Sequence, residues 1–234
     1  MSTICAGLVS IDKSNIIRLV HYTAQEYFEC VRDDKFPTAE LVIARSCLRY
    51  LQFAAFYAGP CDTDSEMQQR LEEYRLLEYA AQNWGHHALA VGEEVQDLSM
   101  RLLDDEGRLQ TLSQVMHLAK DRYPRYSQAF PRGVNSLHIA AWFGLYRHTD
   151  VILVTRVGAA VQRDSNGQSP LLWAVNNGHV YIVRRILRVF KVDINDQDVA
   201  GRTALSLAAR HGHLTLVKDL LALGVKSDVL DTTN

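Results

Sequence analysis

Apolar residues recur along most of this chain with the spacing of helices that are buried on one side. In the second half the clearest case is a set at positions i, i+1, i+4 and i+5, which occurs twice. Its members are Ile182, Val183, Ile186 and Leu187, followed at an interval of 34 residues by Leu216, Val217, Leu220 and Leu221. The two sets predict two equivalent helices and indicate that a larger unit is repeated.

Four columns of identical residues confirm the interval of 34 residues, which is typical of repeat arrays. Together they predict three units at about 132–163, 164–197 and 198–231, each built as a turn, a short helix and a second short helix. The columns are Gly133, Gly167 and Gly201; Leu137, Leu171 and Leu205; Ala140, Ala174 and Ala208; and Gly144, Gly178 and Gly212.

The residues around these columns have the chemistry of turns and helix ends. In the turns, an Asp side chain can accept hydrogen bonds from backbone N–H groups, and Gly can adopt a positive φ. Asn135, Ser169 and Thr203 follow the first glycine column by two residues, and each carries an oxygen that can cap a helix. The last glycine column is expected to end the first helix of each unit in a left-handed conformation.

The first half has a different pattern. Two apolar runs at 8–11 and 16–20 flank the polar residues 12–15, which predicts one β-hairpin. Helical spacing then predicts helices over 38–57, 65–84, 93–104 and 108–120, the second of them ending at Gly85. Residues 122–126 are interpreted as a linker into the repeats.

Segments 168–179 and 202–213 resemble the ankyrin repeat. The resemblance covers about 132–231 and implies an α-solenoid. The histidine that the family carries in the first helix is present only as His138, while Leu172 and Ser206 stand in its place, so we expect a weaker polar network between units. In the first unit the pair at 148–149, His and Thr, replaces the apolar pair of the other units.

The ankyrin resemblance implies a protein-binding surface made of hairpin tips and of the ends of the first helices. Trp142 and Phe143 are the strongest candidates, because exposed aromatic side chains dominate interface energetics. The alternative is that these two pack against helices of the first half. The candidate residues are Trp142, Phe143, Ser165, Asn166, Gln168, Asn176, Asn177, Val199, Ala200, Arg202, Arg210 and His211.

A second resemblance concerns the first half. Segments 17–28 and 79–87 look like the winged-helix region that lies between the NTPase and the ankyrin array in fungal NACHT proteins of the STAND class. It implies a mainly α chain, with a helical winged-helix-like module at 1–125 and the repeats at 126–234. The function it implies is the sensor and regulatory part of a signalling protein.

The motifs of catalysis are missing from the sequence. It contains neither a G-x-x-x-x-G-K-[ST] phosphate loop nor a G-x-S-x-G nucleophile elbow. We therefore expect no enzyme activity, catalytic residue, cofactor, metal or small-molecule substrate, and His86 with His87 is interpreted as structural. The expected function is a protein-interaction scaffold, with a regulatory piece that acts on a NACHT partner chain as the alternative.

Charge and composition limit the classes of partner that we expect for this chain. The 234 residues carry a net charge of -2, with -5 in 1–132 and +3 in 133–234. A global field for nucleic acid is therefore absent, although Arg45 and Arg49 leave DNA binding as a weaker alternative. The longest uncharged apolar stretch, 50–60, is too short to span a membrane, and an intracellular location is expected. A possible basic patch comprises Arg184, Arg185, Arg188 and Lys191.

Overall fold

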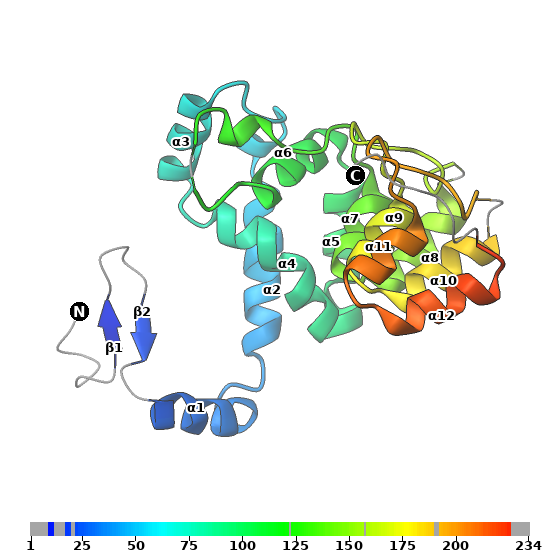
Figure 1. Ribbon diagram of the computed structural model, residues 1–234. Coiled ribbons are helices and arrows are strands. Elements are labelled where there is room, and N and C mark those ends of the chain that lie inside the picture. The colour runs from blue at the N-terminus through cyan, green and yellow to red at the C-terminus, as the bar shows by residue number, and fades with distance from the viewer. Residues whose placement is uncertain are drawn as a thin grey trace. The chain divides into compact units, whose positions relative to one another are not determined.

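The computed structural model describes residues 9–11, 17–19, 22–121, 123–156, 158–189 and 192–225. The chain forms two compact units, 1–40 and 41–234. In the first unit, strand β1 (Val9–Ile11) pairs antiparallel with β2 (Ile17–Leu19), and helix α1 spans Tyr22–Lys35 (Figure 1). Val9 lies opposite Leu19 and Ile11 opposite Ile17.

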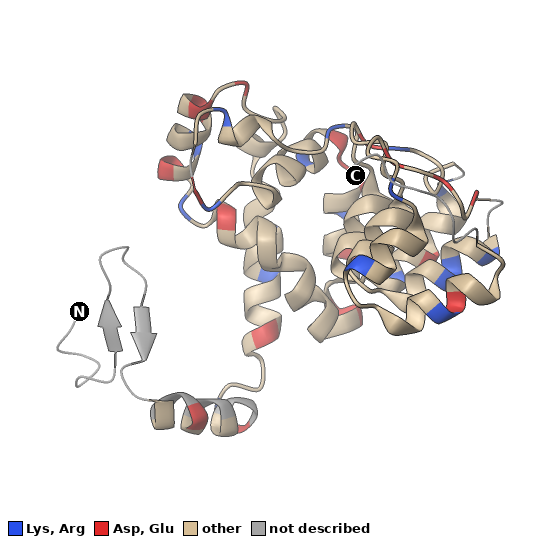
Figure 2. Ribbon diagram, in the orientation of Figure 1, with Lys and Arg blue, Asp and Glu red and all other residues tan. Residues whose placement is uncertain are grey.

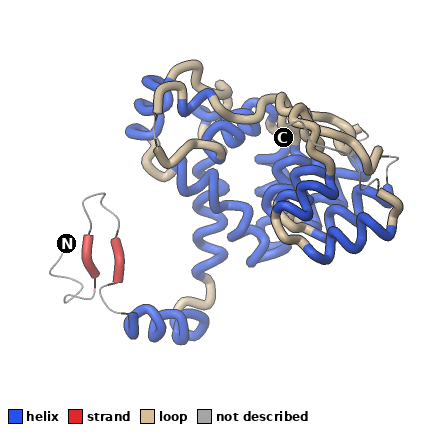
Figure 3. The backbone as a smooth tube through the Cα atoms, viewed as in Figure 1, coloured by secondary structure: helices blue, strands red, loops and turns tan. Residues whose placement is uncertain are grey.

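The second unit is helical (Figure 3). Between 41 and 225 its described residues form helices, turns and loops but no strand, so the winged-helix assignment is not supported. Its first five α-helices are α2 (Ala39–Leu51), α3 (Asp64–Glu73), α4 (Leu77–Val91), α5 (Gln96–Leu103) and α6 (Glu106–Met116). Short 3-10 turns lie at Ala54–Phe56, Gly92–Val95 and Tyr126–Gln128.

The helix predicted over 65–84 is wrong in its limits. Two helices occupy this region, α3 and α4, and they are separated by a break at 74–76. Thr63 begins α3 with a capping box, in which its side chain accepts from the backbone N–H of Glu66 and the Glu66 carboxylate accepts in return. Gly85 does not end a helix but lies in the middle of α4.

The predicted linker at 122–126 is anchored at its C-terminal end. The Asp64 carboxylate, at the start of α3, accepts from the backbone N–H of Arg125 at 2.5 Å and from that of Ser127 at 3.0 Å. The hydroxyl of Ser127 donates to the same carboxylate at 2.6 Å. Three hydrogen bonds to a charged acceptor fix this segment against α3.

Three helix pairs follow, as the repeat predicts (Figure 1). The first helices α7, α9 and α11 pack side by side in one row, and each packs against its second helix. The pairs are α7 (Ser136–Phe143) with α8 (Tyr146–Thr155), α9 (Pro170–Asn176) with α10 (Val180–Val189), and α11 (Ala204–Arg210) with α12 (Leu214–Ala222).

The glycine columns have the conformations that the sequence predicts. The turn glycines Gly133, Gly167 and Gly201 have φ of 71°, 71° and 74°. Those that end the first helices have φ of 77°, 75° and 70°, and they are Gly144, Gly178 and Gly212. Only glycine adopts this left-handed region without strain, which explains why both columns are invariant within the chain.

The predicted caps form at two of the three positions. Asn135 makes a capping box with His138, and Thr203 makes one with Ser206. Ser169 stands at the N-cap of α9, but its side chain makes no cap bond and its buried hydroxyl lacks a hydrogen-bond partner among the described residues. The third residue of α9 is Leu172, which cannot return a bond to the cap.

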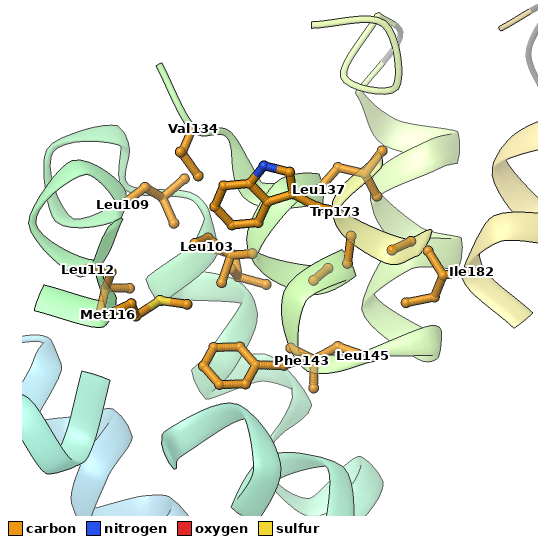
Figure 4. Packing of buried hydrophobic residues seen from close by; sticks show 14 of the residues in the cluster. Leu103, Leu109, Leu112, Met116, Val134, Leu137, Phe143, Leu145, Trp173 and Ile182 are labelled. Carbon is orange, nitrogen blue, oxygen red and sulfur yellow. The ribbon is translucent and has the colours of Figure 1, made fainter. Parts of the chain in front are cut away.

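The hydrophobic core runs without a break from α2 to α12. Figure 4 shows Leu109, Leu112 and Met116 of α6 in the same cluster as Leu137 and Phe143 of the first repeat. Helices α4 and α6 also contact each other, and both contact α7. A boundary between folding modules at 125 and 126 therefore remains a prediction.

Within the described residues, none of the helices combines the length and the apolar character that crossing a bilayer requires.

Candidate functional site

The turn that precedes each first helix is built around one aspartate. Asp164 Oδ1 accepts from the backbone N–H groups of Asn166 at 2.8 Å and Gln168 at 2.9 Å. Thirty-four residues later, Asp198 Oδ1 accepts from those of Ala200 at 2.9 Å and Arg202 at 3.0 Å. The two turns are thus stabilised in the same way, and we call them fingers.

Neighbouring fingers are joined by their backbones. Ser165 N–H donates to the carbonyl of Arg132 at 2.8 Å, and Val199 N–H donates to that of Asn166 at 3.0 Å. The side chains of Ser165, Asn166 and Val199 are exposed, and Ala200 is half-buried. The structure therefore brings these four predicted residues together along one edge of the array.

Two predicted finger residues turn inward. Arg202 is half-buried, and its Nε donates to Asp198 Oδ2 at 2.7 Å. The guanidinium also forms an ion pair, at 2.6 Å through Nη2, with this carboxylate, whose side chain is fully buried. Gln168 Nε2 donates to the same oxygen at 3.1 Å. Both residues stabilise the finger, so their assignment to a partner surface is not supported by the geometry.

The ends of the first helices present one residue each at the same position of the repeat. These are Trp142 on α7, Asn176 on α9 and Arg210 on α11, which lie at intervals of 34. Trp142 and Asn176 are partly exposed, and Arg210 is exposed. We call this row the ladder face. The predicted residues Asn177, which is partly exposed, and His211, which is exposed, follow directly in the chain.

Phe143 corrects the prediction, because its side chain is completely buried. Its ring lies 5.2 Å from the ring of Trp84 and 5.1 Å from that of His86, both on α4. The same ring covers Gly85, where an added Cβ would clash with Phe143 Cγ. Phe143 therefore belongs to the junction between α4 and the repeats, and Trp142 is the aromatic residue of the pair that remains accessible.

Trp142 belongs to an aromatic cluster that sequence reasoning missed. Its ring lies 5.1 Å from His117, at the end of α6, and 5.5 Å from Trp173 on α9. The Trp173 indole N–H donates to Asp164 Oδ2 at 3.0 Å, which ties the cluster to the finger. His117 lies before the first repeat, so no repeat pattern could have identified it.

Histidines join neighbouring helix pairs by hydrogen bonds to backbone carbonyls. The Nε2 of His179 donates to the carbonyl oxygen of Trp142 at 3.0 Å, and that of His213 donates to Asn176 at 3.1 Å. His138 Nε2 donates to the carbonyl of Gln168 at 3.0 Å. Burial lowers the pKa of His138 to about 4. These three side chains have structural roles between units.

In the first repeat, a polar contact forms at the position where the other repeats carry an apolar pair. His148, buried on α8, has its Nε2 2.5 Å from the Ser99 hydroxyl on α5. Burial lowers the pKa of His148 to about 4, which keeps the ring neutral. Ser99 of α5 therefore provides a polar partner for His148, which stands where the other repeats have an apolar residue.

The predicted basic patch on α10 is largely neutralised. Arg184 binds Asp219 of α12 through two hydrogen bonds, at 2.7 and 3.0 Å. Arg185 Nε donates to Asp150 of α8 at 2.5 Å. Arg188 is exposed and Lys191 lies outside the described residues. Figure 2 shows blue and red segments close together along the second helices, which is the pattern of a solvated surface and not of a cationic patch.

A cleft of about 640 Å³ lies between the α5–α6 connection and the start of α7. Arg156 crosses it, donating to the carbonyl of Leu103 at 3.2 Å and the hydroxyl of Ser136 at 2.6 Å. The same guanidinium forms an ion pair with Asp104. Its charge is thus engaged by the chain itself, and the cleft is a weaker candidate site than the ladder face.

The described residues form neither a metal site nor a DNA-binding site. No group of three potential metal ligands gathers among the described residues. His87 Nε2 lies 2.9 Å from the Tyr79 hydroxyl, and the His86 ring packs on Phe143. Arg45 and Arg49 are both exposed on α2, but no feature of the described surface adds to them as a DNA site.

Comparison with known proteins identifies the repeats. Residues 129–231 match the family of ankyrin repeats (3 copies). Similar proteins include the photoreceptor ankyrin repeat protein of Homo sapiens, 41% identical over 70 residues, which are 30% of this chain and 16% of that protein. The human ankyrin repeat domain-containing protein 63 is 36% identical over 94 residues, 38% of this chain and 24% of that protein.

A third similar protein is the E3 ubiquitin-protein ligase XBAT33 of Arabidopsis thaliana, 38% identical over 104 residues, which are 43% of this chain and 20% of that protein. The chain thus spans at most about a quarter of the length of these relatives. Ankyrin repeats generally bind protein partners, and the similarity identifies such repeats at residues 129–231 of this chain.

Proposed function

We propose that this chain is a non-enzymatic interaction module that holds a protein partner against the ladder face and the exposed finger tips of its ankyrin repeats. The observation that carries the proposal is the accessible Trp142 at the head of a row that continues through Asn176 and Arg210. Aromatic and arginine side chains are the commonest energetic anchors of protein interfaces. Ankyrin repeats are generally non-enzymatic and usually intracellular, and we assign the chain to the inside of the cell.

We further propose that the module is the sensor and regulatory part of a STAND-type signalling protein. Support comes from the segment 79–87, which resembles the region before the ankyrin array of such proteins. Trp84 and Gly85 of this segment lie against Phe143 of the first repeat. A partner bound to the repeats could therefore act on α4 through this packed contact.

The alternative is that the chain acts as a regulatory piece on a separate NACHT partner. The two possibilities differ in whether nucleotide changes the set of bound proteins. We expect addition of ATP or GTP to a lysate to leave capture by this chain unchanged if it is a sensor only. Nucleotide-dependent capture of an NTPase would favour the alternative.

The proposal is tested by capture of partners with matched surface variants. We expect proteins captured by the wild-type chain to be lost with Trp142→Ala and with Arg210→Glu. They should be retained with Arg184→Gln combined with Arg185→Gln, which changes the opposite row of helices. Circular dichroism and thermal unfolding verify that each variant is folded. Partners retained by both ladder-face variants would contradict the proposal.

A further inference from the structure

The ladder face changes its chemistry along the array. At one position of three successive helices it offers an indole at Trp142, an amide at Asn176 and a guanidinium at Arg210. Within the described part of the chain, the side-chain amide of Asn176 and the guanidinium of Arg210 have no hydrogen-bond or ion-pair partner, unlike the neighbouring amide of Asn177, which donates to the carbonyl of Trp173 at 2.9 Å. The row therefore presents three different and available groups.

The charge at Arg210 differs from that of most arginines of the repeats, which form ion pairs. Six others in the described region are paired with carboxylates, and they are Arg147, Arg156, Arg163, Arg184, Arg185 and Arg202. The carboxylates of the fingers, Asp164 and Asp198, are buried and accept hydrogen bonds from their own turns. The ladder face is thus positive at its Arg210 end without a described carboxylate that compensates it.

The other end of the row is suited to an apolar side chain. Trp142 lies with His117 and Trp173 at ring distances of 5.1 and 5.5 Å. The Trp173 ring is buried, so the two neighbouring rings hold Trp142 in place. A rigid, partly exposed indole provides contact area at little cost in conformational entropy.

We propose that the ladder face binds an extended peptide segment that places a large apolar side chain on Trp142 and an acidic side chain on Arg210. This inference rests on the proposed function and adds the chemistry of its partner. The amide of Asn176, between the two, can donate to and accept from the peptide backbone of such a segment.

The geometry also fixes the separation of the two anchors. Packed helices lie about 8 to 10 Å apart, so two steps from α7 to α11 span about 16 to 20 Å. An extended chain rises about 3.3 Å per residue. The apolar and the acidic residue of the peptide should therefore be about five or six positions apart.

The experiment is selection of peptides from a displayed random twelve-residue library on the intact chain. We expect enriched peptides to carry Leu, Phe, Trp or Tyr with Asp or Glu five or six positions away. A synthetic peptide of this type should bind about tenfold more weakly to Arg210→Gln and about thirtyfold more weakly to Trp142→Ala. Arg188→Gln, an exposed arginine on α10, is the control and should bind unchanged.

Charge reversal sharpens the test, because Arg210→Glu should select basic residues in place of acidic ones. Selected peptides that require Trp142 but show no acidic residue, or the same acidic residue with Arg210→Glu, would overturn this inference and leave the proposed function intact. Peptides that bind every ladder-face variant as they bind wild type would overturn both. Failure to select any peptide would overturn the extended-peptide inference and favour a folded partner.

Discussion

The ring of Phe143 rests on Gly85, in the middle of helix α4, so closely that a Cβ at Gly85 would clash with the ring. This contact fixes the first repeat against the preceding helices. It also explains why a glycine is used inside a helix, where it costs about 1 kcal/mol relative to alanine.

The first prediction concerns this contact. Gly85→Ala should lower the free energy of unfolding by about 1 to 3 kcal/mol, the usual cost of overpacking, in spite of the better helix propensity of alanine. Urea unfolding measures the change. Adding Phe143→Leu should recover part of the loss, because the smaller side chain leaves room for the new methyl group. A Gly85→Ala protein as stable as wild type would contradict the close packing.

The second prediction uses the repeat as its own control. Gly144, Gly178 and Gly212 share a positive φ, but a Cβ would meet His179 at 2.7 Å and His213 at 2.8 Å at the first two and nothing within 4 Å at the third. Gly212→Ala should therefore cost only the left-handed strain, about 1 to 2 kcal/mol. The other two alanine variants should cost more, because a histidine must also move.

Thermal and urea unfolding of the three glycine variants, measured side by side, check this order. Equal losses at all three positions would show that strain alone decides the effect and that the histidine rings adjust without cost.

The third prediction compares two N-caps. Thr203→Ala removes a capping box and should cost about 1 kcal/mol. Ser169→Ala should leave stability unchanged or raise it. The buried Ser169 hydroxyl has no hydrogen-bond partner among the described residues, and the substitution removes this unsatisfied polar group from the interior. The measurement is the midpoint of urea unfolding. A loss at Ser169 equal to that at Thr203 would mean that the Ser169 hydroxyl does contribute a cap.

The fourth prediction is a loss of stability in mild acid. His138 and His148 have a pKa of about 4 in the folded chain, against an ordinary value of 6.5. The unfolded chain therefore takes up protons between these limits while the folded chain does not, so stability is complete above about pH 6.5 and decreases as the pH falls toward 4. From pH 7.5 to pH 5 each histidine should remove about 2 kcal/mol.

Urea unfolding at the two pH values measures this loss. His148→Gln, which keeps a polar side chain that cannot titrate, should show a smaller pH dependence than wild type. An unchanged pH dependence in that variant would contradict a neutral, buried His148.

The array itself could be predicted because its information is periodic and local. Glycines at equal intervals mark the left-handed positions, and the oxygens of Asn135 and Thr203 mark the helix starts. The role of Gly85 could not be predicted, since a glycine in a helical pattern ordinarily indicates an end and its partner Phe143 is distant in the sequence.

The candidate surface was predicted less completely for the same reason. Arg184 and Arg185 form a charged run by sequence, but each bonds an aspartate 35 residues away on a neighbouring helix. Trp142 is accessible and Phe143 is buried, and this difference cannot be predicted from two adjacent aromatic residues in the sequence.

The burial of Phe143 and His148 by α4 and α5 determines which segment of this chain can be transferred to another protein. Three repeats excised at their first turn would expose a phenylalanine ring and an unpartnered imidazole, both of which are interior groups in this chain. A graft of this array onto another scaffold would therefore have to carry α4 to α6 with it, or replace those two residues by the apolar and polar pattern of a terminal unit. In engineering terms the transferable part is the array together with the helices that cover it.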